Sequence, residues 1–117
     1  MNLVRETAGP ITIIHVEEDR IDASVAIQFK DSFRALIEDD TGPVVLNLGK
    51  VNFLDSSGLG ALVAARKLLG AGRVLDLAGL QPTVTKVMTL TRMNTVFNIH
   101  EDVPQAVAAH GATLSAG

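Results

Sequence analysis

The sequence contains no cysteine, no tryptophan and no tyrosine among its 117 residues, and four phenylalanines are its only aromatic residues. The absence of cysteine excludes disulfide bonds, a thiolate nucleophile and metal sites with cysteine ligands. It also suits a reducing compartment, so we expect a cytoplasmic protein. No apolar stretch approaches the roughly 20 residues that span a bilayer. The segment MNLVRETAGP also lacks the basic start and apolar core of a signal peptide. We therefore expect no direct membrane insertion.

The chain also lacks any block of basic residues. Ten Lys and Arg residues stand against thirteen Asp and Glu residues, which gives a formal charge of −3 at pH 7. Such a surface gives no electrostatic reason to expect a nucleic acid partner. A chain of 117 residues fits one domain that buries a core of its own, and we expect that domain to span residues 1–117, with 111–117 as a flexible tail.

Strand-like and helix-like patterns alternate along the chain. Residues 3–8 and 10–16 are β-favouring runs, and Gly9 and Pro10 between them suit the turn of an antiparallel hairpin. VVLNL at 44–48 is nearly continuously apolar, as expected for a strand covered on both faces in a parallel sheet. Apolar spacing predicts helices over 23–37, over about 58–69 and from Pro82 onward. A short helix is predicted through Val103–His110, with Asp102 and Gln105 as its capping pair. Two further strands are predicted at 73–77 and 95–99.

Strands that alternate with helices imply right-handed crossovers and a mainly parallel sheet. We therefore predict a single α/β domain. Its sheet should have about five strands, with an antiparallel edge strand from the first hairpin and about four helices.

The stretch FLDSSGLGAL at 53–62 joins an apolar strand to a helix, which is where functional surface collects in open α/β sheets. One interpretation is purely structural: Asp55 or Ser56 is an N-cap, and Gly58 and Gly60 let the chain turn and pack tightly. The other is that one serine accepts a phosphate, because a helix N-terminus offers free backbone donors and a partial positive charge. The spacing alone does not choose between Ser56 and Ser57.

Motifs of enzymes and cofactor sites are incomplete in this sequence. Gly58 and Gly60 begin like a dinucleotide-binding fingerprint, but Val63 occupies its third position, and no G-K-[ST] phosphate loop exists. Neither serine lies in a G-x-S-x-G elbow. The three histidines are scattered and show no metal-ligand spacing; they are His15, His100 and His110. We expect no enzyme activity, no metal and no cofactor.

Three segments together resemble the STAS domain family, and specifically bacterial anti-sigma factor antagonists. VVLNLGKVNFLDSSGLGALVAARKLL resembles the family's apolar strand followed by a D-S-x-G-[LIV] turn that opens a helix. ITIIHVEEDRID resembles the strand that leads to the family's first Asp turn, and TLTRMNTVFNIHEDVPQAV resembles its closing helix, strand and helix. The resemblance therefore extends over nearly the whole chain.

The resemblance implies partner switching. An unphosphorylated antagonist binds an anti-sigma factor that is also a serine kinase and thereby frees a sigma factor; phosphorylation reverses this, and a PP2C-type serine phosphatase resets it. Matching to the family's motif places the phosphoacceptor at Ser57. The partner-binding residues implied by the same matching are Asp22, Asp55, Ser56, Gly58, Leu59 and Gly60. We expect the free protein to be a monomer or a weak dimer.

Two residues depart from the family pattern. Asp19 stands where glycine usually precedes the first Asp turn, and Arg92 stands where glycine is common in the late helix. Either could alter the choice of partner. A rival hypothesis is a constitutive STAS subunit of a larger complex, of the lipid-transport or stressosome-like kind, in which the serine turn is only an N-cap. Its partner would then be insensitive to the chemistry of Ser57.

Overall fold

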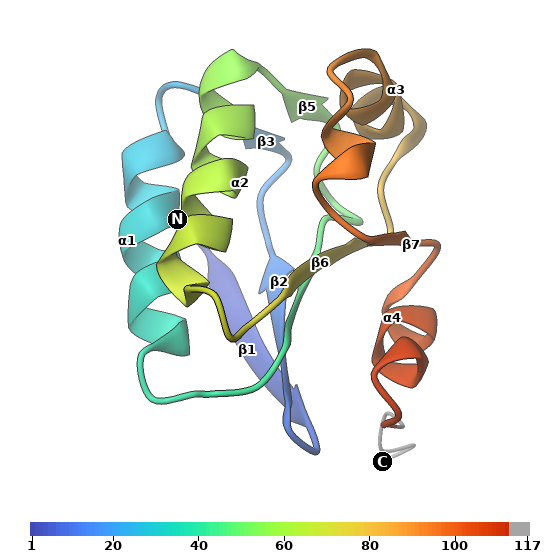
Figure 1. The fold of residues 1–117 in the computed structure, drawn as a ribbon. Helices are drawn as coiled ribbons and strands as arrows, with labels where there is room; N and C mark the ends of the chain where they lie inside the picture. The colour runs from blue at the N-terminus through green and yellow to red at the C-terminus, as the bar shows by residue number, and fades with distance from the viewer. Residues whose placement is uncertain (113–117) are drawn as a thin grey trace.

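A computed structural model describes residues 1–112, so residues 113–117 of the predicted tail lie outside the described part of the chain. A twisted sheet runs through the molecule, with helices on both of its faces (Figure 1). The elements in chain order are β1 (Leu3–Ala8), β2 (Ile11–Val16), β3 (Arg20–Ile21), α1 (Ala26–Ile37), β4 (Val44–Asn47), β5 (Phe53–Leu54), α2 (Ser56–Leu69), β6 (Leu75–Ala78), α3 (Pro82–Leu90), the 3-10 turn η1 (Met93–Thr95), β7 (Ile99–His100) and α4 (Val103–Ala109).

The main sheet has the strand order β1-β2-β4-β6-β7. β1 pairs with β2 in antiparallel register, from Leu3 opposite Val16 to Ala8 opposite Ile11, and every other neighbouring pair in this sheet is parallel. The predicted α/β fold is therefore confirmed, including its hairpin edge strand and, within residues 1–112, its four α-helices.

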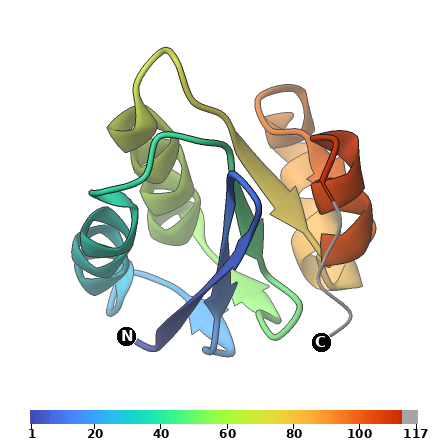
Figure 2. The same cartoon turned by 90° about the horizontal axis from the view of Figure 1, so that it is seen from below.

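Alternate residues of the central strands face two separate apolar clusters. In β2, Ile14 packs into the larger cluster with α1 and α2, while Ile13 packs into the smaller one with α4. Phe29 and Phe33 of α1 stack within the larger cluster, with ring centroids 5.9 Å apart. Seen from below, α1 and α2 lie on one side of the strands, and α4 lies on the opposite side (Figure 2). This burial on both faces explains the nearly continuous apolar run of β4.

The predicted strand at 95–99 is wrong over most of its length. Residues 93–95 form the 3-10 turn η1, and only Ile99–His100 joins the sheet, as β7. The turn follows Arg92, which adopts a left-handed conformation with φ of 59°. Residues other than glycine seldom adopt this region, whereas glycine does so without strain. This conformation explains why glycine is common at the matching position of the family. Asp19, by contrast, has no positive φ.

Helix ends also differ from the prediction. α1 begins at Ala26 rather than Ala23, because residues 22–25 form a turn in which the Val25 N–H donates to the Asp22 carbonyl at 3.1 Å. The predicted cap of α4 is present, since an Asp102 side-chain oxygen accepts from the Gln105 N–H at 2.9 Å. α4 ends in a hydrogen-bonded turn, in which the Gly111 N–H donates to the Ala108 carbonyl at 2.9 Å.

Among residues 1–112, no helix combines the length and the apolar character that crossing a membrane requires.

Candidate functional site

A second, very small sheet positions the serine turn. β3 and β5 pair in parallel over two residues each, with Arg20 opposite Phe53 and Ile21 opposite Leu54. An aspartate follows each strand directly, Asp22 after β3 and Asp55 after β5. Because the carboxyl ends of parallel strands meet at one edge, the two Asp turns lie side by side. The expectation that Asp22 neighbours the serine turn therefore agrees with the geometry.

Asp55 is the N-cap of α2, which begins at Ser56 rather than at the predicted Gly58. One of its carboxylate oxygens accepts from the Gly58 N–H at 2.8 Å, and its main-chain carbonyl accepts from the Leu59 N–H at 2.9 Å. The second carboxylate oxygen accepts from the Ala23 N–H at 3.3 Å. A single side chain thus caps the helix and ties it to the neighbouring turn.

Asp22 organises the first of the two turns. Its Oδ1 accepts from both the backbone N–H of Ser24, at 3.0 Å, and the Ser24 hydroxyl, at 2.6 Å. An Arg20 guanidinium nitrogen lies 3.6 Å from its Oδ2. The Ser24 hydroxyl hydrogen bond, with a smaller contribution from Arg20, holds the pKa of Asp22 below its ordinary value. The carboxylate is therefore fixed in place and ionised at neutral pH.

The two glycines of the turn are not equivalent. A Cβ added to Gly58 would lie 1.9 Å from the Ile21 carbonyl oxygen and 2.8 Å from a Leu54 methyl group, so the helix start packs directly on the backbone of β3. A Cβ added to Gly60 would meet nothing within 4 Å. Gly58 is thus required for the close approach of α2 to β3, whereas Gly60 is exposed and has no steric requirement.

Ser56 and Ser57 occupy the first two positions of α2, and both are exposed. The N–H groups that open a helix have no partner within it, and the Asp55 side chain accepts from that of Gly58. The Leu59 N–H makes the first bond of the helical series, to the Asp55 carbonyl. Among residues 1–112 the N–H groups of Ser56 and Ser57 have no hydrogen-bond acceptor, so they remain available to water or to an anion. Leu59 differs from the serines, because it is half-buried and packs against the larger apolar cluster. It therefore anchors the helix start.

The three histidines lie away from the serines, and each contacts a carboxylate that sequence reasoning did not assign to it. His15 contacts Glu6 at 2.8 Å. His100 and His110 both contact one oxygen of the buried Asp76, at 2.9 and 2.7 Å. The signal that could have located this cluster is the single Asp within the apolar run RVLDL. Within the described residues, no group of three or more histidines and carboxylates is arranged to hold a metal ion.

The model of the STAS domain family matches residues 2–106. The chain belongs to the STAS domain family. A fold of the same kind is seen in an anti-sigma-factor antagonist STAS domain protein from Planctomyces limnophilus, with a TM-score of 0.84, 20% sequence identity, and coverage of 93% of this chain and 97% of that one.

Two further solved structures show how widely the STAS fold is used. SpoIIAA, a cell fate determinant of Bacillus and an anti-sigma factor antagonist, matches in its unphosphorylated form with a TM-score of 0.70 at 21% identity, over 94% of this chain and 97% of that one. A sulfate transporter family protein from Wolinella succinogenes matches with a TM-score of 0.73 at 16% identity, over 87% and 85% of the chains. At these identities the likeness establishes the STAS fold and leaves the function to be argued from the site.

Proposed function

We propose that this protein is an anti-sigma factor antagonist that acts by partner switching. In its unphosphorylated form it binds an anti-sigma factor that is also a serine kinase, and so frees a sigma factor. Phosphorylation at Ser57 ends the binding, and a PP2C-type serine phosphatase restores it. The observation that carries the proposal is an exposed Ser57 on a rigidly capped helix start, beside a second ordered turn.

The helix start can accept a phosphate without unfolding. A phosphoserine brings between one and two negative charges at neutral pH. At the second position of α2 it would meet the positive end of the helix dipole, and the N–H groups of Ser56 and Ser57 can donate to it. Because the Ser57 side chain is exposed, the phosphate displaces no core residue. The fold should therefore survive the modification.

A partner seated over the turn would not tolerate the same phosphate. Asp22 and Asp55 already place two carboxylates beside the serines, and both accept backbone hydrogen bonds that fix them there. A phosphate adds further negative charge to this rim, and a docked partner would have to desolvate it. The modification therefore acts on binding and not on the fold, as a partner switch requires.

The similarity to SpoIIAA supports this proposal, because structures of that protein describe both an unphosphorylated and a phosphorylated form. Asp55, Ser56, Gly58, Leu59 and Gly60 would then form the contact surface around Ser57, with Asp22 at its edge. Gly58 and Leu59 contribute mainly by shaping the helix start, since both are at least half-buried. Ser56 and Gly60 are exposed and are available to touch the partner.

The test is affinity capture from native-cell extract with four baits: wild type, Ser57→Ala, Ser57→Asp and Ser56→Asp. We expect a kinase-fold anti-sigma factor on the wild-type and Ser57→Ala baits, and its loss from Ser57→Asp. Ser56→Asp adds the same charge one residue earlier on the proposed contact surface, and we expect it to weaken capture less than Ser57→Asp does. Phosphate mapping after incubation with the captured kinase should find Ser57, and a phosphate on Ser56 would contradict the assignment.

A constitutive STAS subunit is the second candidate, and the likeness to a sulfate transporter family protein favours keeping it. In that case the Asp55 cap would have only a structural role, and a larger assembly would hold the domain permanently. Equal capture of the same transporter or scaffold subunits by all four baits would support this candidate and contradict the switch.

A further inference from the structure

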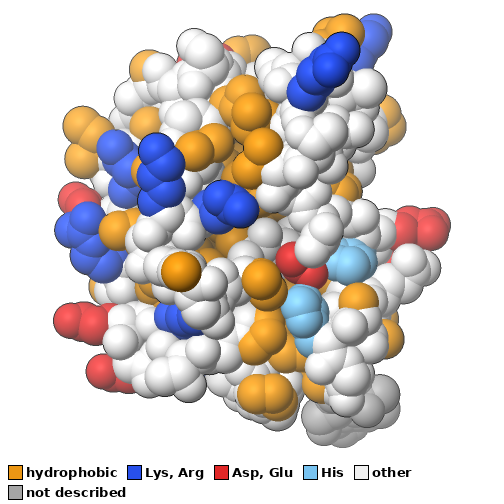
Figure 3. Space-filling view, viewed as in Figure 1, with side chains coloured by type: hydrophobic (Ala, Val, Ile, Leu, Met, Phe, Trp, Pro, Cys, Tyr) orange, Lys and Arg blue, Asp and Glu red, His pale blue; other side chains and the backbone are white. Residues whose placement is uncertain are grey.

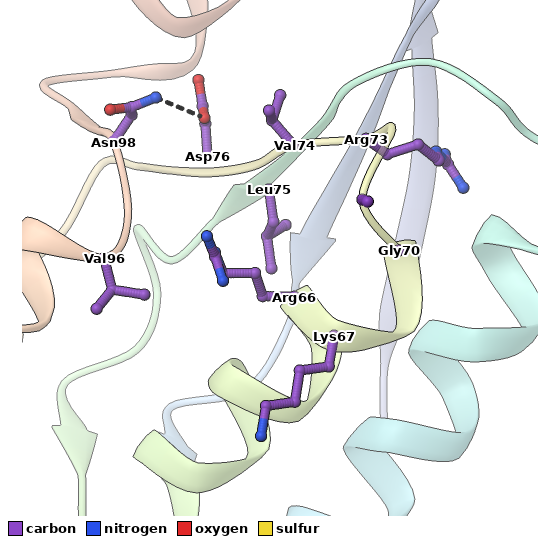
Figure 4. Close-up of a pocket in the computed structure, with 10 residues that line it drawn as sticks. Arg66, Lys67, Gly70, Arg73, Val74, Leu75, Asp76, Val96 and Asn98 are labelled. Carbon is purple, nitrogen blue, oxygen red and sulfur yellow. Dashed lines mark hydrogen bonds between the residues drawn. The ribbon is translucent and has the colours of Figure 1, made fainter.

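A cleft of about 480 Å³ lies at the opposite end of α2 from the serine turn. Its walls come from the last turn of α2, the loop to β6, β6 itself, and the segment between η1 and β7 (Figure 4). α2 has 14 residues, which is about 20 Å at the usual rise per residue. The cleft is therefore remote from Ser57 and is not part of the site described above.

Three basic residues line the cleft, and they are not equivalent. Arg73 points toward α1 (Figure 4), where its guanidinium donates to the carbonyls of Gly42, at 2.8 Å, and Ile37, at 3.3 Å. Arg73 thus has a structural role. Arg66 extends from α2 toward the β6 side of the cleft, whereas Lys67 points away from that strand (Figure 4). Within residues 1–112 neither Arg66 nor Lys67 has a hydrogen-bond or ion-pair partner.

Asp76 is the carboxylate that lines the cleft, and other side chains already contact both of its oxygens. Asp76 lines the cleft but is only 2% exposed, and both histidines of its cluster contact its Oδ2. The Asn98 amide lies 3.5 Å from its Oδ1 (Figure 4). With these groups gathered around it, Asp76 does not serve as the counter-charge of Arg66. The cations at the end of α2 complement the helix dipole, but this role leaves the Arg66 guanidinium without a hydrogen-bond acceptor.

The walls of the cleft also carry exposed apolar surface. Val74 is 45% exposed and Val96 is 37% exposed, and they lie on different sides of the cleft. In the space-filling view, blue cationic side chains lie over α2, with orange apolar side chains beside them (Figure 3). The lining as a whole is more polar than apolar, and Val74 and Val96 are its large exposed apolar side chains.

We propose that this cleft binds a small organic anion. A phosphate or carboxylate group is held by Arg66, with Lys67 contributing at longer range, and an apolar body lies between Val74 and Val96. The second N–H of the Asn98 amide, whose other N–H lies toward Asp76, is a further donor in the lining of the cleft. The proposal does not depend on the switch at Ser57, because it rests on residues at the other end of the helix.

The test is a titration of 15N-labelled protein with phenyl phosphate, which combines a phosphomonoester with an apolar ring. We expect saturable shifts confined to Arg66, Gly70, Val96, Asn98 and their neighbours. Inorganic phosphate, which lacks the ring, should bind several-fold more weakly. Arg66→Gln should weaken phenyl phosphate binding by about tenfold or more, because it removes a charge-assisted hydrogen bond. Arg34→Gln is the matched control: it removes the same charge from an exposed position on α1 and should leave binding within about twofold.

Three results would overturn the proposal. Equal losses in Arg66→Gln and Arg34→Gln, or shifts spread over all surface cations, would mean an adventitious ion only. Equal affinity for phenyl phosphate and inorganic phosphate would mean that Val74 and Val96 do not bind the apolar ring. Binding of a polyglutamate peptide without binding of phenyl phosphate would make the cleft a contact for an acidic protein.

Discussion

The pair of variants Gly58→Ala and Gly60→Ala tests how the helix start is held against β3. At Gly58 the added methyl group would lie 1.9 Å from the Ile21 carbonyl oxygen. An ordinary carbon–oxygen contact is about 3.3 Å, so the two groups would have to separate by about 1.4 Å. The obstacle is backbone and cannot rotate away. Overpacking by one methyl group typically costs about 1–3 kcal/mol, and we expect the upper end here.

Gly60→Ala makes the same chemical change two residues further along the helix, where a Cβ meets nothing within 4 Å. Replacing an exposed glycine inside a helix by alanine should stabilise the protein by about 0.5–1 kcal/mol. The two variants should therefore differ by about 3–4 kcal/mol in the free energy of unfolding, measured by urea denaturation followed by circular dichroism. Equal stabilities for the two variants would refute the inferred packing of α2 on β3.

Three further predictions concern other contacts of the fold. Arg92→Gly should raise the free energy of unfolding by up to about 1 kcal/mol, because φ of 59° is strained for arginine and natural for glycine; a lower urea midpoint than wild type would contradict this. Asp55→Ala should lower the free energy of unfolding by about 1 kcal/mol, because the cap of α2 is lost. Asp55→Asn should recover most of that loss, and equal effects of the two substitutions would show that the cap is not the cause. A hydrogen bond from the Thr12 hydroxyl, and in second place one from Arg5, hold the pKa of Asp40 below its ordinary 3.8. Ionised Asp40 therefore stabilises the fold above pH 3.8, and this stabilisation is lost as the pH falls through the pKa of the folded state. The difference in urea midpoint between wild type and Asp40→Asn should therefore be present at neutral pH and vanish in acid, and a difference that grows in acid would have the wrong sign.

Local patterns were sufficient to predict most of the fold. The hairpin across Gly9 and Pro10, the apolar β4 and the capped α4 each depend on residues close together in the sequence, and each is present. The N-cap at the serine turn was also predictable, but the choice of Asp55 over Ser56 needed the geometry of the turn.

Features made by distant residues were not predictable in the same way. β3 and β5 have two residues each, too few for any alternation to show, and they exist because their backbones pair with one another. The strand character of 95–99 was misleading, since Thr95, Val96 and Phe97 lie in the 3-10 turn and the bend after it. Only Ile99 of this segment joins the sheet. The cluster of Asp76 with His100 and His110 brings together β6, β7 and the end of α4. No spacing in the sequence encodes that meeting.

The proposed switch depends on one phosphate on one side chain. The most direct measurement is the dissociation constant of the captured anti-sigma factor for this protein before and after stoichiometric phosphorylation at Ser57, with Ser56→Ala carried through the same treatment as a control. We expect phosphorylation to weaken binding by at least about tenfold, or 1.4 kcal/mol, while circular dichroism stays unchanged. Equal dissociation constants for the phosphorylated and unphosphorylated forms would contradict the switch and leave the turn with a structural role alone.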